Sequence, residues 1–220
     1  MKRIVCTTLA ILLLGAPLLR AQDITVGVKG GINIADLSTD DPDVEDFTSS
    51  KTGFVGGAYA NFALGGVFAI QPEVLYSAKG TSFEDSDFPD VSLDLNANYF
   101  EIPVLLKAQF PMELVRPAVY VGPVLSFETS CDLSLSQGGV SAEVDCDSQE
   151  AQDEDIDLDR KKTDFGAVFG ASLDLFVGPV VLTGDLRYQL GLTDLNDDPT
   201  YDYSIKNKAW QFMLGVGFQI

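Results

Sequence analysis

Large apolar residues occupy every second position through much of this chain, which is the pattern of β-strands with two different faces. The clearest case is the C-terminal segment, whose alternate positions carry Trp210, Phe212, Leu214, Val216, Phe218 and Ile220. Glycine, glutamine or methionine stands between them. The apolar side has aromatic residues near both ends, as lipid-facing strands do at the two membrane interfaces. The pattern predicts the closing strand of a membrane barrel.

The same alternation predicts seven further strands. They cover about residues 24–34, 52–64, 67–79, 98–110, 117–128, 163–176 and 180–192. Gly65-Gly66 is expected to form a two-residue hairpin turn, because glycine tolerates the positive φ angles of such turns. Pro72, Pro103 and Pro123 fall inside predicted strands. Since proline cannot donate a backbone hydrogen bond, we expect these prolines at bulges or strand ends.

The connections between these segments alternate in length, at about 16, 2, 18, 6, 34, 3 and 15 residues. Tight turns on one rim and long loops on the other are typical of outer-membrane barrels. The sequence therefore predicts an all-β, eight-stranded antiparallel up-and-down transmembrane β-barrel with short periplasmic turns and long acidic outer loops. The alternative is a soluble eight-stranded cup of the lipocalin kind, which would turn its apolar faces inward around a ligand.

The N-terminus has the composition of an export signal. Lys2 and Arg3 precede an apolar run, and Ala21 stands before a polar segment. We interpret residues 1–21 as a secretory signal peptide and residues 22–220 as the barrel domain; a membrane anchor is the alternative. The expected location is the outer membrane of a Gram-negative bacterium. The expected partners are outer-membrane lipid and, through the closing strand, the barrel-assembly machinery; no protein partner is indicated.

The chain is strongly acidic, with 33 acidic and 14 basic residues. The signal segment holds three of the basic residues and no acid, so the remaining chain has a formal charge of −22. This charge excludes nucleic-acid binding through phosphate neutralisation. The four long predicted loops hold 27 of the acids. We interpret them as a solvated anionic rim that binds divalent cations loosely at most, or as an adaptation to high salt.

A defined calcium loop is not favoured. The acidic run at residues 153–159 places oxygen ligands at alternate positions, but an EF-hand needs glycine at its sixth position and glutamate at its twelfth. Leu158 and Asp164 stand there instead. The same long loop holds Cys131 and Cys146, an even pair in an exported chain, which predicts a disulfide. Such a bridge would contribute about 3 kcal/mol by loop closure; two free thiols are the alternative.

The sequence contains no histidine. This excludes the serine-histidine-acid and aspartate-histidine schemes, and it leaves the two cysteines without the usual base. A carboxylate pair such as Glu73 with Glu101 is conceivable as acid and base, but charge pairing in a packed interior explains these residues better. We therefore expect no catalytic site, no metal site and no cofactor.

The polar faces of the predicted strands carry nearly balanced charge. Because unpaired buried charges are costly and an eight-stranded barrel is just wide enough for side chains to fill, we expect a packed network; a wide aqueous pore is the alternative. Gly27, Gly30 and Gly31 lie within a strand pattern and are expected to let the wall bend. The predicted network consists of Lys29, Glu73, Lys79, Glu101, Lys107, Glu128, Asp174, Asp185 and Arg187.

Three segments resemble the recurring motifs of the PorT-like porin family: residues 27–35 (GVKGGINIA), 71–80 (QPEVLYSAKG) and 98–107 (NYFEIPVLLK). The resemblance covers nearly the whole exported chain and implies an outer-membrane β-barrel of about eight strands. Pro72 and Pro103 lie inside these motifs. We expect a non-enzymatic structural or interaction barrel that acts through acidic surface loops. The alternatives are a narrow cation-preferring porin for small solutes and a secretion-accessory role, which only the resemblance implies.

Overall fold

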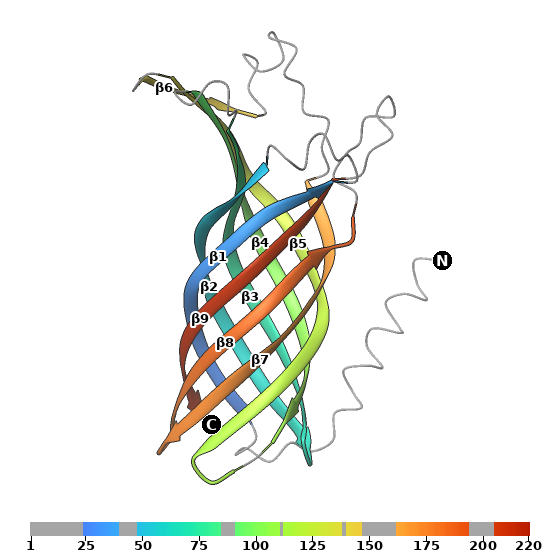
Figure 1. Cartoon of the computed structure of the whole chain (residues 1–220). Helices are drawn as coiled ribbons and strands as arrows, with labels where there is room; N and C mark the ends of the chain where they lie inside the picture. The colour runs from blue at the N-terminus through green and yellow to red at the C-terminus, as the bar shows by residue number, and fades with distance from the viewer. Residues whose placement is uncertain are drawn as a thin grey trace, which may run out of the picture.

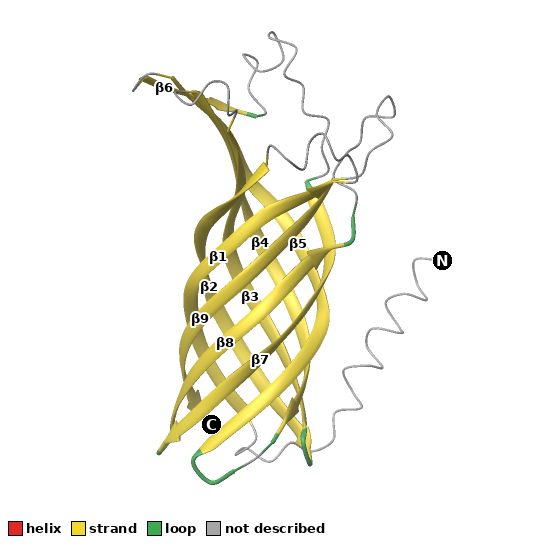
Figure 2. Ribbon diagram, viewed as in Figure 1, coloured by secondary structure: helices red, strands yellow, loops and turns green. Residues whose placement is uncertain are grey.

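The computed structural model describes residues 24–39, 48–84, 91–110, 112–137, 140–146, 162–193 and 205–220. The expected signal peptide and the acidic run at residues 153–159 lie outside these ranges. All regular structure in the described part of the chain is β-strand (Figure 2). The strands are β1 (Ile24–Thr39), β2 (Thr48–Gly65), β3 (Phe68–Glu84), β4 (Val91–Gln109), β5 (Val115–Gln137), β6 (Val140–Asp145), β7 (Thr163–Val177), β8 (Val180–Gly191) and β9 (Ile205–Gln219).

Eight of these strands form a closed antiparallel barrel (Figure 1). The ring runs β1-β2-β3-β4-β5-β7-β8-β9, and β9 pairs with β1 in continuous register from Thr25–Gln219 to Thr39–Ile205. At the end of this seam the Ile220 amide donates to the Ile24 carbonyl oxygen at 2.8 Å. The predicted fold class is confirmed, and residues 210–220 do close the barrel.

The two rims differ as the loop lengths predicted. The β2–β3, β4–β5 and β7–β8 connections are short and lie on the rim near the C-terminus, while the strand ends that the other connections join lie at the opposite rim, called the outer rim below (Figure 1). Gly178-Pro179 joins β7 to β8, and Gly178 has φ +63°, as the first central residue of a type II′ turn requires. In the β2–β3 hairpin the turn is Gly66-Val67, one residue later than predicted, because Gly65 still pairs with Phe68.

The strands are longer at the outer rim than the sequence predicted. Residues 80–84 and 91–97, expected as loop, extend β3 and β4, and part of the expected break at 129–162 is strand as well. The prediction was wrong there because it took polar residues as loop signals. Beyond the membrane, a strand needs only a paired backbone, so serine, aspartate and asparagine are tolerated on its faces.

One part of the wall rises above the ring. The outer ends of β4 and β5 continue past β7 and, with β6, form the part of the sheet that we call the extension: residues 91–97, 130–137 and 140–145 (Figure 1). Residues 80–84 of β3 pair with its β4 edge. β6 was not predicted. A shift of register between Asn98 and Tyr99 separates this sheet from the barrel wall below it.

The three prolines do not lie at bulges or strand ends, contrary to expectation. Pro72, Pro103 and Pro123 sit inside β3, β4 and β5, and the register is the same on both sides of each one. Each proline pairs with one neighbouring strand, and the ladder to the other neighbour is interrupted beside it. A missing N–H removes hydrogen bonds to one neighbouring strand only. Because the proline strand stays paired with its other neighbour, the strand register in a closed ring is kept.

The alternation of faces places the apolar rows on the outside of the wall. On β9 and the residue after it, Trp210, Phe212, Leu214, Val216, Phe218 and Ile220 are all exposed, while Gln211 and Met213 are buried. Phe169, Tyr188 and Trp210 form two tilted ring pairs across β7, β8 and β9, with ring centroids 5.4 and 5.0 Å apart. An outward apolar surface is the arrangement of a lipid-facing barrel and the reverse of a soluble cup. No helix in the described segments is long and apolar enough to cross a membrane.

Gly31 marks a position where the wall allows no side chain. A Cβ added there would collide with the backbone carbonyl of Phe212 on β9, whereas a Cβ added at Gly184 would meet no atom within 4 Å. We therefore expect Gly31→Ala to push the β1–β9 seam apart and to lower the free energy of unfolding by about 1–3 kcal/mol. Gly184→Ala is the matched control and should change it little. Urea titrations of the refolded barrels measure both; equal stability of the two variants would contradict this account of the seam.

Candidate functional site

Four charged side chains meet in the middle of the lumen, and we call them the central charge group: Lys29, Glu73, Asp185 and Arg187. The Lys29 ammonium lies 2.6 Å from Glu73 and 3.1 Å from Asp185. The Arg187 guanidinium lies 2.8 Å from each of the same two carboxylates. All four side chains are at most 1% exposed. Two cations and two anions thus form a closed, neutral set.

The position of these residues in the ring makes the group a barrier. Glu73 lies on β3 and Arg187 on β8, and four strand-to-strand steps separate them in either direction around the eight-stranded ring. β3 and β8 therefore stand on opposite sides of the barrel. The contact between Arg187 and Glu73 spans the whole lumen, and Lys29 on β1 fills one side of it.

Tyrosine and amide side chains surround the group. The Tyr120 hydroxyl donates to Asp185 at 2.6 Å, and Gln71 donates to Glu73 at 2.6 Å. Lys107 donates to the side-chain oxygen of Gln71 at 3.0 Å, so this third cation is joined to the group through an amide. Arg187 also lies over the ring of Tyr120, 5.5 Å from its centroid. These contacts supply the further hydrogen bonds that a buried ion pair needs.

Asp174 is placed nearer the short-turn end of β7, outside the central charge group. It accepts a hydrogen bond from Thr183 at 2.8 Å, and Thr183 lies 3.4 Å from the hydroxyl of Tyr59. Counted together with Lys107 and the central group, the buried charges of the inner half of the lumen are three positive and three negative.

A second polar layer lies toward the outer rim, and we call it the outer tier: Asn33, Lys79, Glu101, Asp164, Gln189 and Gln211. Lys79 lies 2.5 Å from Glu101, which also accepts from Gln189 at 2.9 Å. Gln211 donates to Gln189 at 3.3 Å. All six residues are buried.

Glu128 was predicted to join the lumen network, but the structure does not place it among the buried side chains. It is half-buried, beside the register shift at the base of the extension, where its amide bonds to the carbonyl of Lys162. The extra residue of β5 at this shift, Thr129, follows Glu128 and changes which of the positions beyond it face inward. Strict alternation cannot reveal such a change.

The chemistry of this interior is charge pairing. Glu73 and Glu101, the conceivable acid and base, belong to two different groups, and each is held by cations and amide donors. No cluster of three or more histidine, cysteine, aspartate or glutamate side chains suited to a metal ion occurs among the described residues.

The sequence prediction overlooked the neutral members of these groups. Tyr120, Gln71, Gln189 and Gln211 were not singled out, although they lie at the same inward positions of their strands as the charged residues. A polar residue that stands an even number of positions from a charged lumen residue on the same strand faces the same side. This spacing would have identified them.

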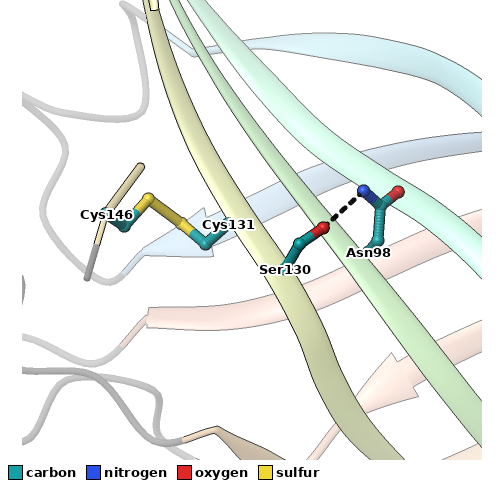
Figure 3. The surroundings of a disulfide bond; sticks show 4 residues. All are labelled: Asn98, Ser130, Cys131 and Cys146. Carbon is teal, nitrogen blue, oxygen red and sulfur yellow. Dashed lines mark hydrogen bonds between the residues drawn. A yellow bond between two sulfur atoms is a disulfide. The ribbon is translucent and has the colours of Figure 1, made fainter. Parts of the chain in front are cut away.

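Cys131 and Cys146 form a disulfide, as predicted, with their Cα atoms 5.5 Å apart (Figure 3). The bond fastens the end of β6 to β5, and the Cys146 amide donates to the Cys131 carbonyl at 3.0 Å. Asn98 on β4 donates to Ser130 on β5 at 2.9 Å beside it (Figure 3). The extension is thus anchored covalently where it leaves the barrel.

Comparison with known proteins gives one family and several solved structures. The family model described as outer membrane protein beta-barrel domain matches residues 20–197. No curated protein matches the chain.

Three of the similar solved structures come from Yersinia, Neisseria and Pseudomonas. Ail, the attachment invasion locus protein of Yersinia pestis, is 15% identical with a TM-score of 0.42, over 88% of this chain and 97% of that one. Neisserial surface protein A is 17% identical with a TM-score of 0.45, over 90% and 97%. OprG of Pseudomonas aeruginosa is 9% identical with a TM-score of 0.48, over 90% and 96%.

Proposed function

Because the chain belongs to the outer membrane protein β-barrel domain family, we propose that it is a non-enzymatic barrel with a closed lumen that acts as an interaction platform through its extension and surface loops. Membership of the family implies an outer-membrane lipid environment. We also propose that residues 1–21 are the export signal, that the closing strand is what the barrel-assembly machinery recognises, and that the likeness to PorT-like porins reflects a closer relationship.

The observation that carries the closed lumen is the contact between Arg187 and Glu73 across the full width of the ring. A solute would have to break this contact and those of Lys29 and Asp185 with it. Separating buried charges in a low-dielectric interior costs several kcal/mol per ion. This argues against transport as the main activity and directs attention to the cell surface.

The extension has the features of a recognition element. Its register puts Leu95, Leu133 and Val144 on one face, with Leu135 beside them, while Asp94 and Ser134 belong to the other face. Leu135 is 47% exposed. An apolar surface on a sheet that a disulfide already holds in place costs little entropy to bind, which favours recognition of a partner.

In-cell photocrosslinking tests the platform. A photoreactive amino acid at Leu135 should give a discrete adduct in intact cells, and the same residue at Val121, exposed on the wall within the ring, should not. Replacing both cysteines with serine should reduce the adduct severalfold, because the extension loses about 3 kcal/mol of loop-closure stabilisation while the ring keeps its pairing. Unchanged crosslinking without the disulfide, or no adduct at position 135, would contradict the platform.

A narrow cation-preferring porin is the second candidate. The acidity of the loops favours it, since negative walls at a mouth raise the local concentration of cations. It requires that the central charge group open, and conductance measurements separate it from the platform. A secretion-accessory role is a third possibility that rests on the family resemblance alone.

A further inference from the structure

The outer tier differs from the central charge group in its charge balance. Its buried ionisable side chains are Lys79, Glu101 and Asp164, one cation against two carboxylates. Asp164 lies within electrostatic range of both Lys79 and Glu101. An uncompensated buried charge is costly, so either a bound cation or a proton must balance the tier.

Several buried oxygen atoms of the outer tier accept no hydrogen bond. The amide nitrogens of Asn33, Gln189 and Gln211 all donate to other groups in the lumen, and Asn207 donates to Asp164 at 3.2 Å. Four oxygen atoms of the tier find no hydrogen-bond partner among the described residues: Asn33 Oδ1, Glu101 Oε2, Asp164 Oδ1 and Gln211 Oε1. Each belongs to a residue that is at most 2% exposed. Among the donors of the tier, Lys79 Nζ makes no hydrogen bond beyond its ion pair with Glu101.

The strand register brings these oxygens to one layer. Asn33 on β1 is directly opposite Gln211 on β9. On the other side of the ring, Glu101 is opposite Ser126, and Ser126 is opposite Asp164. The chain of hydrogen bonds from Gln211 through Gln189 to Glu101 joins the two sides across the lumen.

We propose that the outer tier binds a small hydrated monovalent cation, sodium or potassium, between the carboxylates of Glu101 and Asp164 and the amide oxygens of Asn33 and Gln211. Carboxylate and amide oxygens are the ligands that hard cations prefer. A single positive charge makes the tier neutral, whereas a divalent ion would leave an excess beside the Lys79 ammonium. Asp164 is the second residue of β7, so the site lies close to the outer rim, from which an ion can enter.

The test compares the thermal stability of the barrel in small cations with its stability in a cation too large to enter the lumen. The full exported chain, refolded in detergent, is unfolded by heat in N-methylglucamine chloride, and sodium or potassium chloride replaces that salt at constant ionic strength. We expect the midpoint temperature to rise and saturate with the small cation. Asp164→Asn should raise the half-maximal concentration about tenfold or more, because the site loses a charged ligand.

Asp36→Asn is the matched control, since Asp36 faces outward on β1 and pairs with Lys208 at the surface; it should keep the wild-type response. Gln211→Met removes one ligand oxygen without changing the charge of the tier. This variant replaces Asp164→Asn in the test if Asp164→Asn does not refold. Equal midpoints in N-methylglucamine and sodium would overturn the proposal and mean that a proton balances the tier. An unchanged response in the Asp164 or Gln211 variant would also overturn it, placing the cations at the acidic loops.

Discussion

Replacing Arg187 with methionine is expected to lower the free energy of unfolding by about 3–5 kcal/mol. Methionine keeps much of the volume, but it removes the guanidinium that contacts Glu73 and Asp185. Two buried carboxylates then share one neighbouring cation, Lys29. Urea titration of the refolded protein measures the loss, with the single tryptophan, Trp210, as the fluorescence reporter.

Two variants show whether charge pairing causes this loss. Glu73→Gln combined with Arg187→Met removes one acid and one base together and leaves Lys29 paired with Asp185, so it should recover much of the stability. Lys208→Met breaks a surface pair with Asp36 whose side chains are 28% and 26% exposed. It should cost at most about 1 kcal/mol. A double variant as unstable as Arg187→Met alone would show that packing, not charge, dominates the middle of the lumen.

Leu214→Arg is expected to destabilise the barrel in lipid vesicles by about 2–4 kcal/mol. Leu214 is 77% exposed and lies midway along β9, between the aromatic residues Trp210 and Phe218. A guanidinium at this depth meets hydrocarbon and must be hydrated or reach the interface. Urea unfolding from vesicles measures the cost.

The control for Leu214→Arg is the same substitution at Met112, which is 57% exposed in the short β4–β5 connection. Met112→Arg should cost about 0–1 kcal/mol, because the side chain lies near an interface. If both arginines were tolerated equally, the outward face of β9 would not lie in hydrocarbon.

The barrel fold could be predicted from the sequence, because the alternation of apolar and polar residues and the loop lengths carry most of the information in such a fold. The apolar row of β9 and the alternation of short and long connections were enough to predict eight strands and their closure. The extension was missed because its serine and aspartate residues were taken as loop signals, although leucine alternates with them in this segment. The prolines were misplaced because a ring that is closed on both sides keeps its register where one ladder is interrupted.

The interior was predictable in composition but not in its contacts. The inward parity of Lys29, Glu73 and Arg187 could be read from the chain, whereas the pairing of Arg187 with Glu73 depends on the ring order that sets β8 opposite β3. The division into a neutral central charge group and an acidic outer tier depends in the same way on which strands face each other. Glu128 shows the limit, because the register of the wall shifts directly after it and its side chain stays half-buried.

The measurement that tests the closed lumen most directly is single-channel recording of the refolded exported chain in a planar bilayer. Migration on a denaturing gel that changes with heating shows beforehand that the barrel is folded. We predict a silent membrane, since the contact between Arg187 and Glu73 spans the lumen. Discrete cation-selective steps from the folded protein would contradict a closed lumen and establish the narrow porin in its place.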